Sequence, residues 1–281
     1  MRPRSEPSSR TNCAPTEPVA IDPTTNRDPT GRTVPGAARG PRVANAPRLL
    51  DVGEAALVVE FGQAVDPAVH DRVLALDAAL GAASVAGLGE CVPTYRSLTI
   101  HYDPLILDRA QLCRTVTDLL ASAVPRPRAG RLWTVPCCYD PALAEDIEAV
   151  AAWAGLPAAQ VAARHAAADY RVYMYGFAPG FAYLGGLTAD LGIARRESPR
   201  PPHPANAILI GGGLAAVATV PMPTGWYVIG RTPERLYSGA RRRTFLVEAG
   251  DTLRFEPIDA ATFAGLEGRA AGGEIIARME G

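Results

Sequence analysis

Between Tyr170 and Ile258, frequent glycine and proline residues divide the sequence into short apolar segments. Short runs rich in Val, Ile and aromatic residues are typical of β-strands, and the glycines and prolines between them are typical of tight turns. A series of short strands must bury its apolar side chains by closing into a barrel or by packing as two sheets. The pattern therefore predicts a β-barrel or β-sandwich. The predicted strands are YRVYMYGF, AILIGG, AAVATV, WYVIG, TFLVEAG and TLRFEPI.

The part of the chain before this region alternates strands with helices. From Arg48 it reads as two strands, a helix, two more strands and a second helix that begins after the N-cap Asp108. This order predicts a small α+β domain, which a proline-rich linker at 124–131 follows. The first helix has apolar residues at helical spacing, namely Val69, Val73, Leu76 and Leu80.

The whole chain is predicted to be α+β and to have four parts. Residues 1–47 contain nine prolines and no aromatic residue, a composition typical of a disordered tail. The small α+β domain covers 48–123, the β-barrel domain covers 132–258, and a C-terminal segment covers 259–281. The barrel domain begins with a strand at LWTVPCCYD and two helices, the second of which starts at Pro157.

Composition excludes several classes of site. All 28 basic residues are arginine, so the chain has no lysine for a Walker-type phosphate site, a Schiff base or the attachment of biotin. The net charge of −1 gives no electrostatic basis for binding nucleic acid, and no apolar run is long enough to cross a membrane. The five cysteines contain no zinc-like C-x-x-C pair, and with no signal peptide they indicate the cytoplasm.

Three local patterns have both a structural and a functional interpretation. The adjacent Cys137 and Cys138 lie in a predicted strand, so one is expected to point inward and the other outward. GGGLAA, from Gly211, matches a dinucleotide-binding fingerprint, but strand-like residues follow where a helix is required, which indicates a false match. The histidines show no metal-ligand spacing. His165 is spaced to pair with Asp169 on a helix, and a structural role at the helix end is favoured over catalysis.

The segment YGFAPGFAYLGGL places aromatic rings beside turn-forming residues. Its Pro-Gly pair predicts a type II turn, because glycine accepts the positive φ at the third position. The turn would hold two phenylalanine rings on a fixed loop, either as the wall of a pocket or as a barrel corner with core aromatic residues. The final Gly-Gly pair would let the backbone approach a neighbour or a ligand closely. The candidate pocket residues in this segment are Phe177, Pro179, Gly180, Phe181 and Tyr183.

Five parts of the sequence together carry a family resemblance. They are YRSLTIHYDP, YRVYMYGFAPGFAYLGGL, the Pro199-Arg200 pair, GWYVIGRTP and AGDTLRFEPI. From Arg48 to Ile258 the chain resembles the allophanate hydrolase subunit 1 family, and the GF-x-PGF-x-YLGGL part is highly specific. The family includes the B-type subunit of the bacterial ATP-dependent 5-oxoprolinase, a sporulation-kinase inhibitor and part of the carboxyltransferase region of urea carboxylase. The resemblance implies a small α/β domain followed by a cyclophilin-like β-barrel.

The resemblance also implies a function. It points to a cytoplasmic subunit of an ATP-dependent 5-oxoprolinase, which opens the lactam of 5-oxoproline to glutamate. It implies ATP shared with partner subunits, a homologous carboxyltransferase-like subunit and a third oxoprolinase subunit as partners, and no activity of the isolated chain. Arg200 or Arg231 could hold the substrate carboxylate or neutralise developing charge. No residue stands out as a catalytic base, and no metal ligand is predicted.

Two other functions remain open. The first is a non-catalytic regulatory module that inhibits a sensor kinase, as the sporulation inhibitor does. Aliphatic residues at 214–219, where the family usually has polar side chains, favour this alternative slightly. The second is a carboxyltransferase half-domain of a biotin-dependent enzyme, with the biotin carried by another chain.

Overall fold

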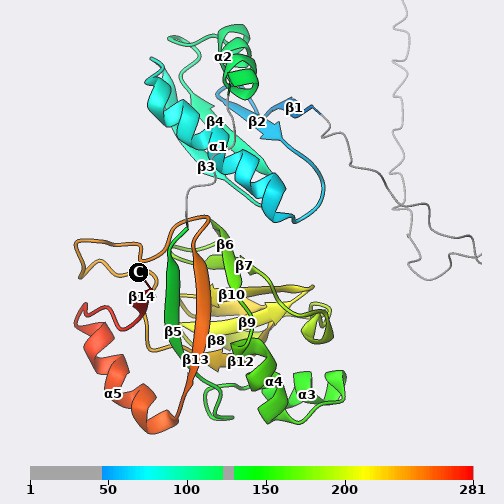
Figure 1. Cartoon of the computed structure of the whole chain (residues 1–281), viewed down its shortest axis with the longest axis vertical. Coiled ribbons are helices and arrows are strands. Elements are labelled where there is room, and N and C mark those ends of the chain that lie inside the picture. The colour runs from blue at the N-terminus through cyan, green and yellow to red at the C-terminus, as the bar shows by residue number, and fades with distance from the viewer. Residues whose placement is uncertain (1–45, 123–129, 281) are drawn as a thin grey trace, which may run out of the picture. The chain divides into compact units, whose positions relative to one another are not determined.

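The computed structural model describes residues 46–122 and 130–280 (Figure 1). Almost all of the predicted tail at 1–47 lies outside the described residues, as does most of the predicted linker at 124–131. The described part contains a small open sheet with two helices and a larger closed sheet.

A four-stranded antiparallel sheet and two helices form the N-terminal region. Its elements are β1 (Arg48–Asp51), β2 (Ala56–Glu60), α1 (Pro67–Ala83), β3 (Leu88–Pro93), β4 (Ser97–Tyr102) and α2 (Arg109–Ser122). The strand order is β1-β2-β4-β3, so the two hairpins join through β2 and β4. Val73, Leu76 and Leu80 of α1 are buried in the core of this region, as their helical spacing predicts.

Aspartate side chains cap both helices of this region. Asp66 Oδ1 accepts hydrogen bonds from the N–H groups of Ala68 (2.7 Å) and Val69 (3.2 Å) at the start of α1. Asp108 Oδ1 accepts one from the N–H of Gln111 (2.8 Å) at the start of α2. Each carboxylate satisfies N–H groups that have no partner within the helix. The predicted cap at Asp108 is confirmed.

Seven strands close into a β-barrel. They are β5 (Leu132–Cys138), β6 (Tyr170–Tyr175), β7 (Ala182–Gly185), β9 (Ala207–Gly211), β10 (Leu214–Ala218), β12 (Tyr227–Arg231) and β13 (Thr252–Ile258). Their order is β12-β9-β10-β7-β6-β13-β5, and β12 returns to β5 by pairing Arg231 with Cys138. Only the pair of β13 and β5 is parallel within the described barrel. A mixed chain with a closed barrel confirms the predicted fold class.

Residues after Ile258 belong to the barrel. β14 (Arg278–Glu280) pairs with the first three residues of β5, on the edge whose last residue pairs with β12. The helix α5 (Ala260–Ala271) also contacts β5 (Figure 1). The remaining elements are α3 (Ile147–Ala154), α4 (Ala158–Ala166), a 3-10 helix at Ala189–Leu191, and a two-stranded ribbon of β8 (Arg200–His203) and β11 (Met222–Thr224).

Alternate residues of the barrel strands face an interior filled with side chains. The strand residues in between include Leu209 and Ala216, which form a second cluster outside the barrel with Phe181 and Trp226. Because the interior is packed, a ligand site must lie at an end of the barrel or on its outside. The fully buried interior residues include Val172, Leu184, Ile208, Val217 and Leu253.

The prediction of a strand at TFLVEAG is wrong. Within this segment, Phe245 forms a single bridge with Tyr237, and the chain then turns. The carboxylate of Asp251 accepts a hydrogen bond from the N–H of Glu248 (2.9 Å), so this turn is held by a side chain and not by a strand partner.

The two adjacent cysteines lie on opposite sides of β5, as predicted: Cys137 belongs to the interior cluster and Cys138 does not. Both are nevertheless fully buried, because α5 contacts the same strand. The interpretation of GGGLAA as a false match is confirmed. Gly212 and Gly213 have φ of +63° and +76° and form the tight turn of the β9–β10 hairpin, which no helix follows.

Candidate functional site

The Pro179-Gly180 turn has the predicted form. The N–H of Phe181 donates to the carbonyl of Ala178 (3.0 Å), and Gly180 has φ of +73°. A Cβ at Gly180 would collide with the Cβ of Tyr237. The position therefore requires glycine for its backbone conformation and for its close approach to the loop after β12.

Phe177, two residues earlier, is both strained and exposed. It has φ of +69°, and the N–H of Ala178 donates to the carbonyl of Gly176 across it (2.8 Å), as in a γ-turn with positive φ. The residue as a whole is 77% exposed. A bulky residue held in this conformation, and exposed to solvent, is a candidate for contact with a partner.

The other two rings of the segment pack on the outer wall of the barrel. Phe181 and Tyr183 have ring centroids 4.8 Å apart, and Tyr183 lies 6.3 Å from Trp226. Neither ring lines either of the two pockets described below. Both rings therefore contribute to packing at this corner of the barrel.

Arg200 and Arg231, the arginines selected from the sequence, are each engaged in ion pairs. Arg200 pairs with Glu145 and, at 3.2 Å, with Asp146. Arg231 pairs with Glu267 on α5 at 3.1 Å. The two side chains lie on different elements and share no partner. Guanidinium N–H groups used in these pairs are not available to a ligand.

A pocket of about 400 Å³, here called the barrel-end pocket, lies beside the Pro179-Gly180 turn. Residues before β9, after β10 and after β12 form it. The turn is tied to its wall, because Thr219 Oγ1 donates to the carbonyl of Pro179 (2.5 Å). Arg235 is the one charged residue of the wall. The lining residues are Ala205, Asn206, Thr219, Val220, Pro221, Arg235, Tyr237, Ser238, Gly239 and Ala240.

Arg235 is not neutralised by any carboxylate of residues 46–122 or 130–280. The acid next to it in the sequence, Glu234, is fully buried. Glu234 accepts hydrogen bonds from Arg241 Nη1 (3.0 Å) and from the N–H groups of Ile276 (2.6 Å) and Ala277 (2.7 Å). These bonds anchor the loop that carries Arg235 and leave its guanidinium available at the pocket wall.

Asn206 supplies an amide to the same wall. Its φ of +56° is in the left-handed region, which asparagine tolerates better than most residues, and its carbonyl accepts a hydrogen bond from Thr232 (3.0 Å). Within the part of the chain that the structure describes, its side-chain amide forms no hydrogen bond. The backbone is thus fixed while the amide is available.

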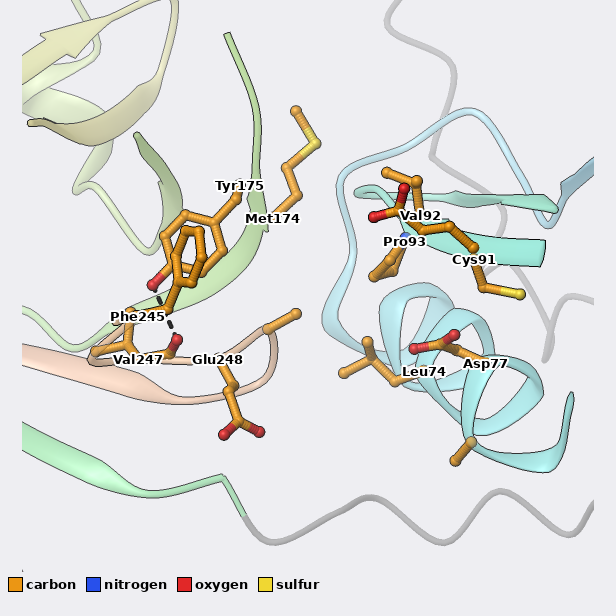
Figure 2. Close-up of a pocket in the computed structure, with 13 residues that line it drawn as sticks. Leu74, Asp77, Cys91, Val92, Pro93, Met174, Tyr175, Phe245, Val247 and Glu248 are labelled. Atoms are coloured by element: carbon orange, nitrogen blue, oxygen red, sulfur yellow. Dashed lines mark hydrogen bonds between the residues drawn. The ribbon is translucent and has the colours of Figure 1, made fainter. Parts of the chain in front are cut away.

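A second pocket of about 600 Å³, here called the acidic pocket, has mostly apolar walls and three carboxylates (Figure 2). Residues of α1 and β3 form one side, and residues of β6 and the loop before β13 form the other. Burial raises the pKa of Asp77, and burial together with Asp77 and Glu90 raises the pKa of the Cys91 thiol to about 11. This thiol is protonated at neutral pH and unsuited to act as a nucleophile. The lining residues are Leu74, Asp77, Ala78, Glu90, Cys91, Val92, Pro93, Met174, Tyr175, Phe245, Val247, Glu248 and Ala249.

His165 has a structural role. Its Nδ1 lies 2.8 Å from the hydroxyl of Tyr139, while Asp169 pairs with Arg254 at 2.5 Å. The pair of His165 and Asp169 suggested by their spacing is therefore not formed. Burial lowers the pKa of His165 to about 3, so its imidazole is neutral and packed in the core.

His70 on α1 is also held neutral. Its Nε2 lies 2.8 Å from the carbonyl of Tyr173, and its Nδ1 accepts a hydrogen bond from Arg171 Nε (3.0 Å). These partners require the proton on Nε2. Burial and the charge of Arg171 lower the pKa of His70 to about 4.

No group of three or more His, Cys, Asp and Glu side chains in residues 46–122 and 130–280 is arranged to hold a metal ion. Among the helices of these residues, none combines the length and the apolarity that crossing a membrane requires.

Comparison with known proteins shows which family has this architecture. Residues 47–247 match the family described as carboxyltransferase domain, subdomain C and D. The chain belongs to this family. The B-type subunit of 5-oxoprolinase from Bacillus subtilis (strain 168) is 32% identical over 215 residues, which are 73% of this chain and 90% of that protein.

Solved structures agree with this assignment. The crystal structure of TTHA0988 is similar with a TM-score of 0.66 and 35% identity over 73% of this chain, which spans only 40% of the TTHA0988 chain. The urea carboxylase of Kluyveromyces lactis is similar in fold, with a TM-score of 0.69 and 14% identity over 83% of this chain and 24% of that protein.

Sequence reasoning missed Arg235 and Asn206. Both residues lie in loops, where apolar residues do not recur at helical or strand spacing. The left-handed conformation of Asn206 is visible only in the structure. One signal was present in PERLYSG: an adjacent Glu-Arg pair cannot both point to the same side of an extended loop. That signal does not say which of the two charges is buried.

Proposed function

We propose that this chain is a subunit of a 5-oxoprolinase, which opens the lactam ring of 5-oxoproline to give glutamate. The observation that carries the proposal is the 32% identity to a B-type subunit of 5-oxoprolinase over 90% of that protein. The barrel-end pocket supports it, because a small concave site with one basic and no acidic lining residue suits a small carboxylic acid.

The reaction explains a requirement for ATP. A lactam is a poor electrophile, and phosphorylation of its oxygen by ATP would make the ring carbon reactive enough for water to add. The C–N bond would then break, the nitrogen leaving as the amine of an acyl phosphate, and a second water would hydrolyse that acyl phosphate to glutamate and phosphate. The described residues of this chain include no glycine-rich loop that opens a helix, so they do not fit an ATP phosphate site on their own. In our proposal the nucleotide and the group that activates water are shared with, or supplied by, partner subunits.

The proposed assembly is a cytoplasmic hetero-oligomer. Its other members are a homologous carboxyltransferase-like subunit and a third oxoprolinase subunit. The exposed Phe177 offers an apolar contact for a partner. Pro179 and Gly180 support the wall of the pocket, and Arg200 and Arg231 stay candidates for neutralising charge once partners are bound.

The test is reconstitution. The purified chain is assayed for release of ADP and glutamate, first alone and then mixed with the two candidate partner subunits. We expect no turnover by the chain alone and turnover in the mixture. Turnover by the chain alone would contradict the subunit model. An inactive mixture would favour the regulatory module, which predicts inhibition of a sensor kinase, or the carboxyltransferase half-domain, which predicts carboxyl transfer from biotin on another chain.

The departure from the family's polar residues at 214–219 bears on these alternatives. Residues 214–218 form β10, whose side chains are packed in the interior cluster or in the outer cluster. Of this segment only Thr219 lines the barrel-end pocket. The aliphatic substitutions therefore leave the wall of this pocket polar, and they favour the regulatory alternative less than the sequence suggests.

A further inference from the structure

We propose that the barrel-end pocket binds 5-oxoproline with its carboxylate on Arg235 and its lactam edge beside the amide of Asn206. The inference rests on the proposed function and deepens it by naming the binding residues and the orientation of the substrate.

Arg235 is the proposed binding partner of the substrate carboxylate. Most arginines near this end of the barrel are engaged: Arg231 with Glu267 and Arg241 with Glu234. Arg235 is half-buried in the wall and pairs with no carboxylate of the described residues. A partly desolvated guanidinium without a counterion favours an anion, and its planar fork matches a carboxylate in two parallel hydrogen bonds.

The side-chain amide of Asn206 is the proposed binding partner of the lactam edge. In a five-membered lactam the N–H and the C=O lie on the same edge of the ring. A primary amide presents a donor and an acceptor side by side, so it can make two hydrogen bonds to such an edge. Asn206 is 7% exposed and is one of the residues that line the pocket. Proline, which lacks the ring carbonyl, could not form this pair.

The rest of the wall suits the ring. Val220, Pro221 and Tyr237 provide apolar surface for the ring methylene groups. The loop with Arg235 is fixed by the buried pair of Glu234 and Arg241, so little ordering is needed when the ligand binds. A positive charge from Arg235 and an amide from Asn206 in the wall of one small cavity define one orientation of the substrate in this proposal.

Calorimetric titration of the full chain, alone and in the three-subunit mixture, tests the proposal with 5-oxoproline, 2-pyrrolidinone and proline as probes. Arg235→Gln removes the carboxylate partner, and Asn206→Gly removes the amide while keeping a residue that accepts positive φ. Arg242→Gln, at an exposed position outside the pocket, is the matched control. Melting curves establish that each variant is folded.

We expect Arg235→Gln to weaken 5-oxoproline binding at least tenfold and to leave the weaker binding of 2-pyrrolidinone unchanged, because that probe has no carboxylate. Asn206→Gly should weaken 5-oxoproline several-fold and leave proline unchanged, and Arg242→Gln should match the unmodified chain. No binding of 5-oxoproline in the mixture, or equal binding by a folded Arg235→Gln variant, would overturn the inference. The mixture could also bind 5-oxoproline through Arg235 and still show no turnover. That result would support the binding site and would contradict only the proposed 5-oxoprolinase function.

Discussion

The barrel-end pocket and the acidic pocket have opposite charge, although arginine and acidic residues occur near both. The first is lined by one arginine and no acid, and the second by three carboxylates and no base. Near the acidic pocket, Arg171 pairs with Asp71 and His70 and contributes no free charge. In the barrel-end pocket the acid, Glu234, is the residue that is used internally. Of the three carboxylates in the acidic pocket, Glu248 pairs with Arg131 (3.1 Å) and Arg243 (2.9 Å). Among the described residues, the negative charge of this pocket therefore rests on Asp77 and Glu90. The sign of each pocket is set by the charges that are left after such pairs form.

The largest effect should come from removing the buried acid beneath the barrel-end pocket. Glu234→Ala leaves the side chain of Arg241, which is 5% exposed, without its partner, and the three backbone N–H groups of Arg235, Ile276 and Ala277 without this acceptor. We expect a loss of about 3–5 kcal/mol in the free energy of unfolding, measured by urea denaturation. Glu267→Ala, which breaks a half-exposed pair with Arg231, should cost less than about 1 kcal/mol. Equal losses would show that pairing does not set the character of this pocket.

A smaller effect is expected at the turn beside the same pocket. Gly180→Ala adds a Cβ that collides with Tyr237 in a backbone conformation that alanine disfavours, so stability should fall by about 1–3 kcal/mol. The matched control is Gly81→Ala in α1, where a Cβ meets nothing within 4 Å. That change should raise stability by about 0.5–1 kcal/mol. Thermal melting of both variants measures the difference, and a Gly180→Ala variant as stable as the original chain would contradict the geometry of the turn.

Acid should destabilise the chain in part through His70 of α1, the helix that lines the acidic pocket, in addition to the buried His165, whose pKa is also lowered. His70 has a folded-state pKa of about 4 and an ordinary value of 6.5, so between these pH values the unfolded chain binds a proton that the folded chain does not. Stability should therefore fall as the pH drops from 6.5 to 4, by up to about 1.4 kcal/mol per pH unit for this one group. His70→Gln should reduce the slope of unfolding free energy against pH. His101→Gln, at an exposed position, should keep the full slope, and identical slopes for the two variants would exclude His70 as the cause.

The smallest effect is predicted in the acidic pocket itself. Burial raises the pKa of Asp77, which means that the folded chain disfavours its ionised form at neutral pH. Asp77→Asn removes the charge and should raise stability by a few tenths of a kcal/mol, on the order of a surface substitution. Asp118→Asn, on the exposed side of α2, should leave it unchanged. Denaturation at pH 7 gives both values. A destabilised Asp77→Asn variant would show that this carboxylate is stabilised in the pocket and would weaken the contrast.

The sequence predicts a structural element well where the spacing of apolar residues, or the conformational requirement of one residue, is enough to specify it. Apolar spacing marks α1, and the positive φ of Gly180 follows from its place in the Pro-Gly turn. The Gly-Gly pair after Leu184 also approaches its neighbours closely, since a Cβ at Gly185 would collide with the ring of Tyr173 and one at Gly186 with the carbonyl of Asp169. Such constraints are local, and local sequence contains them.

The charged site depends on residues that are distant in the sequence. Arg200 is engaged by Glu145, 55 residues away, and Glu234 by backbone groups of Ile276 and Ala277, more than 40 residues away. No periodicity predicts which arginine remains free after such pairs form. TFLVEAG shows the same limit, because its residues suit a strand but Asp251 holds a turn there.

The position of β5 has a consequence for synthesis of the chain on the ribosome. β5 is the first barrel strand to be made, yet it pairs with β13 and β14, and Thr134 hydrogen-bonds to Glu280, 146 residues later. At roughly 5–20 residues per second, on the order of ten seconds pass before those partners emerge. The N-terminal sheet, whose pairings all lie between Arg48 and Tyr102, can form within that interval. The newly made β5, with Trp133 and Val135 not yet covered, therefore stays without these strand partners after the N-terminal sheet can already have formed.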